Sequence, residues 1–267
     1  MPNYSVEKSL AEEDFWPEMQ RQIIKTWEQD KDSIRRFTKE RGINRLCHFT
    51  MALNLKSIFS HGLKSRIDLS KHNIYHHKIE TATKIYFQDF IYLSISSPNL
   101  KMIHSKFKAT SPLAIINLPI KLLWKYPFFS IPWNSARRDM ITSIQEDFSR
   151  FLGIKGLGNL FLNSKIRSKH NVHISEPTDL QSEIIFLTSI KPSFLKEVLI
   201  TPMDKTSKEF LNLAKDLEFF ESGVIQKHQF KWLEINKIES WGPGKSTDSR
   251  LKYNERDWRD DWYLDGN

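Results

Sequence analysis

The chain has 267 residues, of which 39% are hydrophobic and 12% aromatic, enough for one large domain or for a core domain with an appendage. A net charge of +8 favours polyanionic partners such as nucleic acid, although many basic proteins bind none. The single cysteine, Cys47, excludes an intramolecular disulfide and fits a reducing compartment. We find no apolar signal region and no run long enough to cross a bilayer, so we expect a cytoplasmic protein without membrane contact.

The first segment has a helical pattern over residues 6–40. Met19, Ile23 and Trp27 recur at four-residue spacing, which places them on one face of a helix. We therefore expect residues 1–42 to form an N-terminal helical extension that packs on the main domain.

Short apolar or alternating runs after this segment predict strands, and longer periodic runs predict helices. The expected strands cover residues 46–50, 91–96, 113–118, 183–187 and 198–200. The expected helices cover residues 53–59, 137–152 and 204–221. Because strands and helices do not alternate regularly, the pattern indicates an α+β fold with its main domain over residues 43–240.

The composition changes near residue 240, and residues 241–267 form a tail rich in Trp, Asp and Arg. Trp258, Trp262 and Tyr263 could dock this tail on the domain, since tryptophans are costly to expose. Chain ends often fray, so loose order is the alternative.

Familiar catalytic and metal-binding signatures are absent from the sequence. It has no Gly-rich phosphate loop and no pair of metal-binding cysteines. Two groups of histidines are present, namely His72, His76 and His77, and His170 with His173. Neither group has a recognised ligand spacing, so we interpret them as solvated loop histidines and expect no metal. Cys47 precedes His48 on an expected strand, where neighbours point to opposite faces, so we interpret Cys47 as a small buried hydrophobe.

Four short segments of the sequence nevertheless form a recognisable series along the chain. They are His48-Phe49-Thr50 with the residues that follow to Arg66, then residues 92–102, Pro132-Trp133-Asn134-Ser135-Ala136, and residues 176–185. Together they resemble the DarT family of bacterial toxins, which ADP-ribosylate nucleic acid, over roughly residues 44–202. The resemblance implies an ADP-ribosyltransferase-like mixed β-sheet core, NAD as co-substrate, and a base in single-stranded DNA or RNA as acceptor.

The resemblance makes Glu183 the catalytic carboxylate. Cleavage of NAD at its nicotinamide ribose builds positive charge on the sugar, which a nearby carboxylate can stabilise while it holds a ribose hydroxyl. Considered alone, Glu183 would be an exposed charge at the start of a strand.

The resemblance also implies a set of contacts to NAD. An imidazole can both donate and accept hydrogen bonds, which suits the role of ribose contact that the family gives to His48. The set of expected NAD-binding residues is His48, Phe49, Thr50, Ser65, Ser94 and Ser96. Thr50 shares a strand face with His48, and Ser94 shares one with Ser96, with ordinary packing as the alternative for the two serines.

On the acceptor side, the resemblance implies that Gln181 helps to determine which group of the acceptor is modified. The family usually has an arginine shortly before its central segment, but residues 76–84 contain none. Lys78, Lys84 or His77 could substitute, although lysine and arginine are not equivalent at a bidentate site. The missing arginine favours a base with an exocyclic amino group over thymine, whose ring nitrogen must first lose a proton.

Basic residues flank the resembling segments, among them Lys101 and Lys106, and a second group is Lys165, Arg167, Lys169 and His170. With Trp124, Tyr126, Phe128 and Trp133 they could hold a single strand by phosphate contacts and stacking, or they could be solvated loops and buried aromatics. The family further implies a cognate antitoxin protein and a role in toxin–antitoxin or anti-phage defence. A transferase acting on a protein, or an inactive nucleic-acid-binding relative, remains the alternative.

Overall fold

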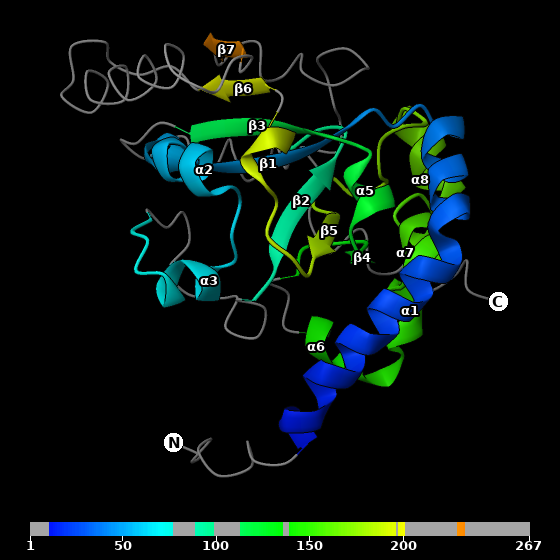
Figure 1. Cartoon of the computed structure of the whole chain (residues 1–267). Coiled ribbons are helices and arrows are strands. Elements are labelled where there is room, and N and C mark those ends of the chain that lie inside the picture. The colour runs from blue at the N-terminus through cyan, green and yellow to red at the C-terminus, as the bar shows by residue number, and fades with distance from the viewer. Residues whose placement is uncertain are drawn as a thin grey trace, which may run out of the picture.

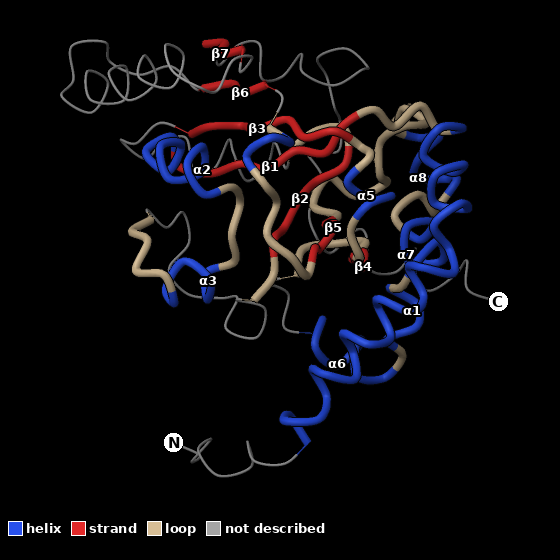
Figure 2. The backbone as a smooth tube through the Cα atoms, viewed as in Figure 1, coloured by secondary structure: helices blue, strands red, loops and turns tan. Residues whose placement is uncertain are grey.

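The computed structural model of the chain describes residues 11–76, 89–98, 113–135, 139–195, 197–200 and 229–232. Its helices are α1 (Ala11–Glu40), α2 (Leu55–His61), α3 (Arg66–Lys71), α5 (Leu122–Lys125), α6 (Asp139–Glu146), α7 (Gly153–Asn159) and α8 (Ser164–Lys169). Its strands are β1 (Arg45–Met51), β2 (Ile91–Ile95), β3 (Leu113–Pro119), β4 (Phe128–Ile131), β5 (Glu183–Phe186), β6 (Glu197–Ile200) and β7 (Gln229–Trp232). Helices and strands are intermixed along the chain (Figure 2), which confirms the predicted α+β class.

The strands form one mixed sheet in the order β4-β5-β2-β1-β3-β6-β7, in which β6 and β7 are parallel and the other neighbours are antiparallel. β1 pairs with β3 along its whole length, from Arg45 opposite Pro119 to Met51 opposite Leu113. On its other side, β1 pairs with β2 only through Leu46 and Cys47. The two central strands therefore stop pairing directly before His48.

Helix α1 packs along one side of the sheet, beside α5 and α7 (Figure 1). Met19, Ile23 and Trp27 are buried as their spacing predicts, and so is Ile34. Trp27 also donates from Nε1 to the carbonyl of Leu123 at 2.8 Å. Trp27 and Ile34 belong to the same core cluster as residues of the sheet, so this part of α1 shares the core of the main domain.

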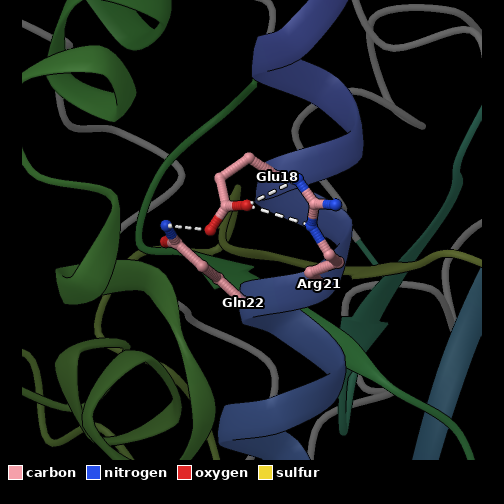
Figure 3. Close-up of polar contacts among 3 residues, drawn as sticks. All are labelled: Glu18, Arg21 and Gln22. Carbon is pink, nitrogen blue, oxygen red and sulfur yellow. Dashed lines mark hydrogen bonds and ion pairs between the residues drawn. The ribbon is translucent and has the colours of Figure 1, made fainter.

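The outer face of α1 is polar. Figure 3 shows Glu18 held by Arg21 and Gln22, one helical turn further on, with an Nη2-to-Oε2 distance of 2.8 Å to Arg21. The hydrogen bonds from Gln22 and then Arg21 lower the pKa of Glu18. Such an exposed arrangement contributes little to stability, because water and salt screen it.

A glycine lets α7 dock closely on α1. Gly153 begins α7 with a φ of +51°, and a Cβ at this position would lie 2.1 Å from Oδ2 of Asp30 in α1. The same Oδ2 accepts a hydrogen bond of 2.9 Å from the backbone N–H of Ile154. Only a residue without a side chain fits both the left-handed conformation and the contact.

The expected strands are all present, with small shifts at their ends: residues 46–50 lie in β1, 91–95 in β2, 113–118 in β3, 183–186 in β5 and 198–200 in β6. The helix expected over 53–59 is a 3₁₀ turn, Ala52–Asn54, followed by α2, which ends at Gly62 with a φ of +80°. The helix predicted over 204–221 and the tail over 241–267 lie outside the described residues.

The single helix predicted over 137–152 is wrong. The described part of this range forms α6 and then a separate 3₁₀ turn, Phe148–Phe151, and Asp147 between them is not helical, with φ −153° and ψ 84°. The carboxylate of Asp147 accepts a hydrogen bond from the Ser149 hydroxyl at 2.6 Å. Such local side-chain bonds compete with the helix and end it.

Among the helices of the described ranges, none is both long enough and apolar enough to span a membrane.

Candidate active site

Glu183 is the first residue of β5 and lies opposite Ile131, the last residue of β4. The segment after β4 returns across the start of β5. There the backbone N–H of Ser135 donates to Oε2 of Glu183 at 2.9 Å, and the hydroxyl of Ser182 donates to the carbonyl of Pro132, also at 2.9 Å. The Glu183 carboxylate thus accepts a hydrogen bond from the main chain, which helps to fix its position.

Gln181 lies in the turn that leads into β5. Its backbone N–H donates to Oδ1 of Asp179 at 2.7 Å, and its side-chain oxygen accepts from Nδ2 of Asn134 at 3.3 Å. Asn134 and Ser135 are neighbours in sequence, so one segment contacts both Gln181 and Glu183. The structure therefore brings these two predicted site residues together.

Tyr92 of β2 lies on the strand next to Glu183 and pairs with Ile185. Burial raises the pKa of the Tyr92 phenol well above its usual value, and the negative charge of Glu183 raises it further. The positive charge of Arg66 and the nearby Ser135 hydroxyl act in the opposite direction. Glu183, Arg66 and Ser135 are therefore all close enough to Tyr92 to affect its ionisation.

His48 lies on β1 at the point where pairing with β2 has ended. Its Nδ1 is 2.9 Å from the carbonyl oxygen of Tyr92. Since a carbonyl can only accept, Nδ1 carries the proton, and in the neutral imidazole Nε2 is then the accepting nitrogen. Tyr92 thus contacts His48 through its main chain and lies close to Glu183 through its phenol.

Thr50 and Ser65 have structural hydrogen bonds. The Thr50 hydroxyl accepts from Nδ2 of Asn54 at 2.9 Å. The Ser65 hydroxyl caps α3 by accepting from the backbone N–H of Asp68 at 3.0 Å. A hydroxyl that accepts one bond still has a proton to donate, so these roles are compatible with contacts to a ligand.

The two serines of the central segment do not share a strand face as predicted. Ser94 lies in β2 opposite Cys47, but β2 ends at Ile95, and Ser96 has a left-handed φ of +61°. Its hydroxyl donates to the carbonyl of Ser175 at 2.6 Å. The left-handed conformation breaks the strand alternation, so Ser96 joins β2 to the segment before the glutamate motif.

Phe49 and Cys47 flank His48 on β1. Phe49 is half-buried and lies opposite Ile115 of β3. Cys47 is buried, as predicted, and donates from Sγ to Oδ1 of Asn117 at 3.3 Å. Burial raises the pKa of its thiol to about 12, which rules out a thiolate nucleophile at neutral pH.

The predicted acceptor-side lysines Lys78, Lys84, Lys101 and Lys106 lie outside the described residues. Arg167, one of the basic residues considered for nucleic-acid contacts, holds the segment before Glu183. Its guanidinium donates to the carbonyls of Glu176 and His173, each at 2.8 Å.

The aromatic residues considered for base stacking are mostly part of the core. Phe128 is fully buried, Trp124 donates from Nε1 to the Thr38 hydroxyl at 3.1 Å, and Tyr126 packs edge-on against Phe194. Within the described ranges, no group of three or more His, Cys, Asp or Glu side chains is arranged to hold a metal ion.

Sequence reasoning assigned no role to Tyr92, Ser135 or Arg66. All three lie in the segments that carry the DarT resemblance, which was the available signal. The proximity of Tyr92 and Ser135 to Glu183 depends on the pairing of β2, β4 and β5, and sequence spacing does not reveal that pairing.

No protein-family model matches the sequence, and no curated protein does. Among solved structures, the chain is similar to Thermus sp. 2.9 DarT in complex with NAD+, with 12% identity and a TM-score of 0.41 over 70% of this chain and 94% of that one. The same DarT with ADP-ribosylated ssDNA gives 12% identity and a TM-score of 0.41 over 70% and 93%.

Thermosipho africanus DarTG in complex with ADP-ribose gives 11% identity and a TM-score of 0.42 over 70% of this chain. The match covers 49% of the DarTG chain, so this chain spans about half of that protein's length. Identities of this size carry no information on the ligands of this chain.

Proposed function

We propose that this protein is a DarT-type ADP-ribosyltransferase that uses NAD and modifies a base in single-stranded DNA or RNA. The observation that carries the proposal is the arrangement of His48, Tyr92 and Glu183. The His48 imidazole is bonded to the main chain of Tyr92, and the phenol of Tyr92 is affected by the Glu183 charge. An imidazole and a carboxylate from distant parts of the sequence thus each interact with the same residue of the central strand, one with its main chain and the other with its side chain.

The reaction exchanges one bond to the ribose anomeric carbon for another. The bond to nicotinamide breaks, and nicotinamide leaves with the electron pair. A nitrogen of the acceptor base then bonds to the same carbon and loses a proton. Glu183 stabilises the positive charge that develops on the sugar and holds a ribose hydroxyl. The backbone N–H of Ser135 keeps the carboxylate in place, so that little reorganisation is needed during the reaction.

His48 binds the other ribose of NAD in this proposal. Its Nδ1–H group donates a hydrogen bond to the Tyr92 carbonyl. Nε2 of the neutral ring then accepts a hydrogen bond from a ribose hydroxyl. Thr50 and Ser65 can each donate a hydroxyl proton to the dinucleotide, and Phe49, Ser94 and Ser96 complete the proposed pocket.

The acceptor is proposed to lie beside Gln181, which Asn134 orients. Arg66 is a positive charge near Tyr92, where it opposes the effect of the Glu183 charge. Lys78, Lys84, Lys101 and Lys106 would hold the nucleic-acid backbone through phosphate contacts. An acceptor with an exocyclic amino group fits best, because it needs no strong base to attack.

An enzyme of this kind would act as a toxin by blocking copying or translation of the modified strand. Its activity would require restraint by a cognate antitoxin protein, and a toxin–antitoxin or anti-phage role follows.

The test is mass spectrometry of matched single-stranded DNA and RNA oligonucleotides after incubation with the protein and NAD. The expected result is a mass gain of one ADP-ribose, and fragmentation then identifies the base and decides between DNA and RNA. NAD consumption without a modified oligonucleotide would indicate a protein acceptor. Intact NAD with both oligonucleotides unmodified would overturn the proposal.

A further inference from the structure

The hydroxyl of Ser135 is buried beside the Tyr92 phenol. The residue is only 5% exposed, and its Oγ has no hydrogen bond of ordinary geometry within the described ranges. An unpaired buried hydroxyl carries a free-energy penalty, so in native structures it calls for an explanation, such as a ligand that completes it.

The position of this hydroxyl points to the proposed NAD site. The backbone N–H of the same residue donates to Oε2 of Glu183 at 2.9 Å, so the hydroxyl belongs to a residue that contacts the carboxylate directly. It also lies near enough to the Tyr92 phenol to lower the pKa of that group. The Ser135 hydroxyl is therefore beside both groups that mark the reacting end of the site.

Ser130 provides an internal comparison. Its Oγ is also buried and unpaired in the described structure, and the residue is fully shielded from solvent. Ser130 lies opposite Ile184, whereas the next residue, Ile131, lies opposite Glu183. Because side chains alternate along a strand, Ser130 points to the face of the sheet away from Glu183.

We propose that the Ser135 hydroxyl binds a hydroxyl of the NAD ribose that Glu183 holds, which makes Ser135 a further substrate-binding residue. This inference rests on the proposed function. A ribose presents two adjacent hydroxyls on one edge, so Glu183 can bind one while Ser135 binds its neighbour. A serine hydroxyl donates and accepts, which matches the hydrogen-bonding capacity of a sugar hydroxyl.

The experiment compares wild type with Ser135→Ala and the control Ser130→Ala in calorimetric titrations with carba-NAD+, ADP-ribose and ADP. Ser135→Ala keeps the backbone N–H that holds Glu183 and removes only the hydroxyl. It is expected to raise the Kd for carba-NAD+ and ADP-ribose by about three- to tenfold, the effect of losing one hydrogen bond. The Kd for ADP, which lacks the second ribose, should not change, and Ser130→Ala should match wild type with all three ligands.

Thermal melting without ligand separates this role from a structural one. Removing an unpaired hydroxyl should leave the Tm of Ser135→Ala equal to or above that of wild type. If this variant does not fold, Ser135→Cys keeps the shape of the side chain with a much weaker hydrogen-bonding group and should show the same pattern of Kd changes.

The ribose contact would be overturned if Ser135→Ala bound ADP-ribose with the affinity of wild type. A loss of affinity for carba-NAD+ alone would also overturn it, and so would a loss of affinity that extends to ADP. These results differ from a failure of the proposed function, in which wild type itself binds neither carba-NAD+ nor ADP-ribose.

Discussion

The His48 imidazole donates a hydrogen bond from Nδ1 to the main-chain carbonyl of Tyr92 at 2.9 Å. The bond bridges β1 and β2 just beyond the pair formed by Cys47 and Ser94, where their ladder ends. The phenol of the same tyrosine is affected by the Glu183 charge on the other neighbouring strand, β5. Tyr92 thus links three adjacent strands: its main chain contacts the imidazole of β1, and its side chain lies close to the carboxylate of β5.

Replacement of Glu183 by Gln should remove the chemical step and leave the protein folded. Gln keeps an oxygen that can accept the Ser135 N–H bond, but it has no charge with which to stabilise the developing cation. We expect transfer to fall by about a hundredfold or more, the usual effect of losing such stabilisation. Single-turnover transfer and NAD titration check this, and near-normal transfer by Glu183→Gln would show that another group performs the role.

Replacement of His48 by Ala should weaken NAD binding by about three- to tenfold through loss of one hydrogen bond. The change also removes the donor to the Tyr92 carbonyl, which should lower the free energy of unfolding by about 1 kcal/mol. NAD titration and urea unfolding measure the two effects. His72→Ala is the control, because the His72 ring also bonds a carbonyl, that of Asp68, at the exposed end of α3. Equal NAD affinity in the His48 and His72 variants would contradict the assignment.

Replacement of Arg66 by Ala should slow transfer by about tenfold, since the site loses a positive charge that opposes Glu183 near Tyr92. Arg66→Lys distinguishes a point charge from a planar, bidentate contact, because lysine keeps only the charge. Lys71→Ala, at the other end of the same short helix, is the matched control. Transfer rates of Arg66→Ala and Lys71→Ala that equal that of wild type would remove Arg66 from the proposed mechanism.

Most strands could be predicted because the signal is local. The apolar run before Pro119 and the alternation after Phe90 identify β3 and β2 without knowledge of their neighbours. The convergence of Glu183 with Tyr92 could not be predicted in the same way. It depends on β5 inserting beside β2, although their residues are about ninety positions apart in the sequence, and spacing does not determine such pairing.

The errors arose where a side chain overrides the backbone pattern. Asp147 bonds to Ser149 and divides a helix that the apolar periodicity predicted as continuous. Ser96 adopts a left-handed conformation and bonds to Ser175, 79 residues away, so strand alternation does not extend to it. For Arg167, the sequence left a phosphate contact and a solvated loop open, and the structure gives its guanidinium carbonyl partners in its own neighbourhood.

Replacement of Gly153 by Ala should destabilise the contact between α7 and α1. The new Cβ would lie 2.1 Å from Oδ2 of Asp30, and the φ of +51° would be strained. We expect the free energy of unfolding to fall by about 1–3 kcal/mol. Gly158→Ala in the same helix is the control, since its Cβ meets nothing within 4 Å. It should be neutral or stabilising by up to about 1 kcal/mol, so equal urea midpoints for the two variants would contradict the prediction.

The stability of the protein should fall in alkali partly through Cys47. Burial raises the pKa of this thiol to about 12 in the folded state, from an ordinary value of 9.0. Between these values the unfolded chain releases a proton that the native protein retains, so rising pH favours unfolding. This contribution is fully present below pH 9 and is lost at about 1.4 kcal/mol per pH unit above it.

Urea unfolding of wild type and Cys47→Ala at pH 8 and pH 10 measures this contribution. The alanine variant loses packing at both pH values, and the other titrating groups are common to both proteins. We therefore expect wild type to lose about 1.4 kcal/mol more free energy of unfolding than Cys47→Ala between pH 8 and pH 10. One full pH unit of this interval lies above the thiol's ordinary pKa. A constant difference would mean that the thiol ionises equally in the folded and unfolded states, and that burial in β1 does not shift its pKa.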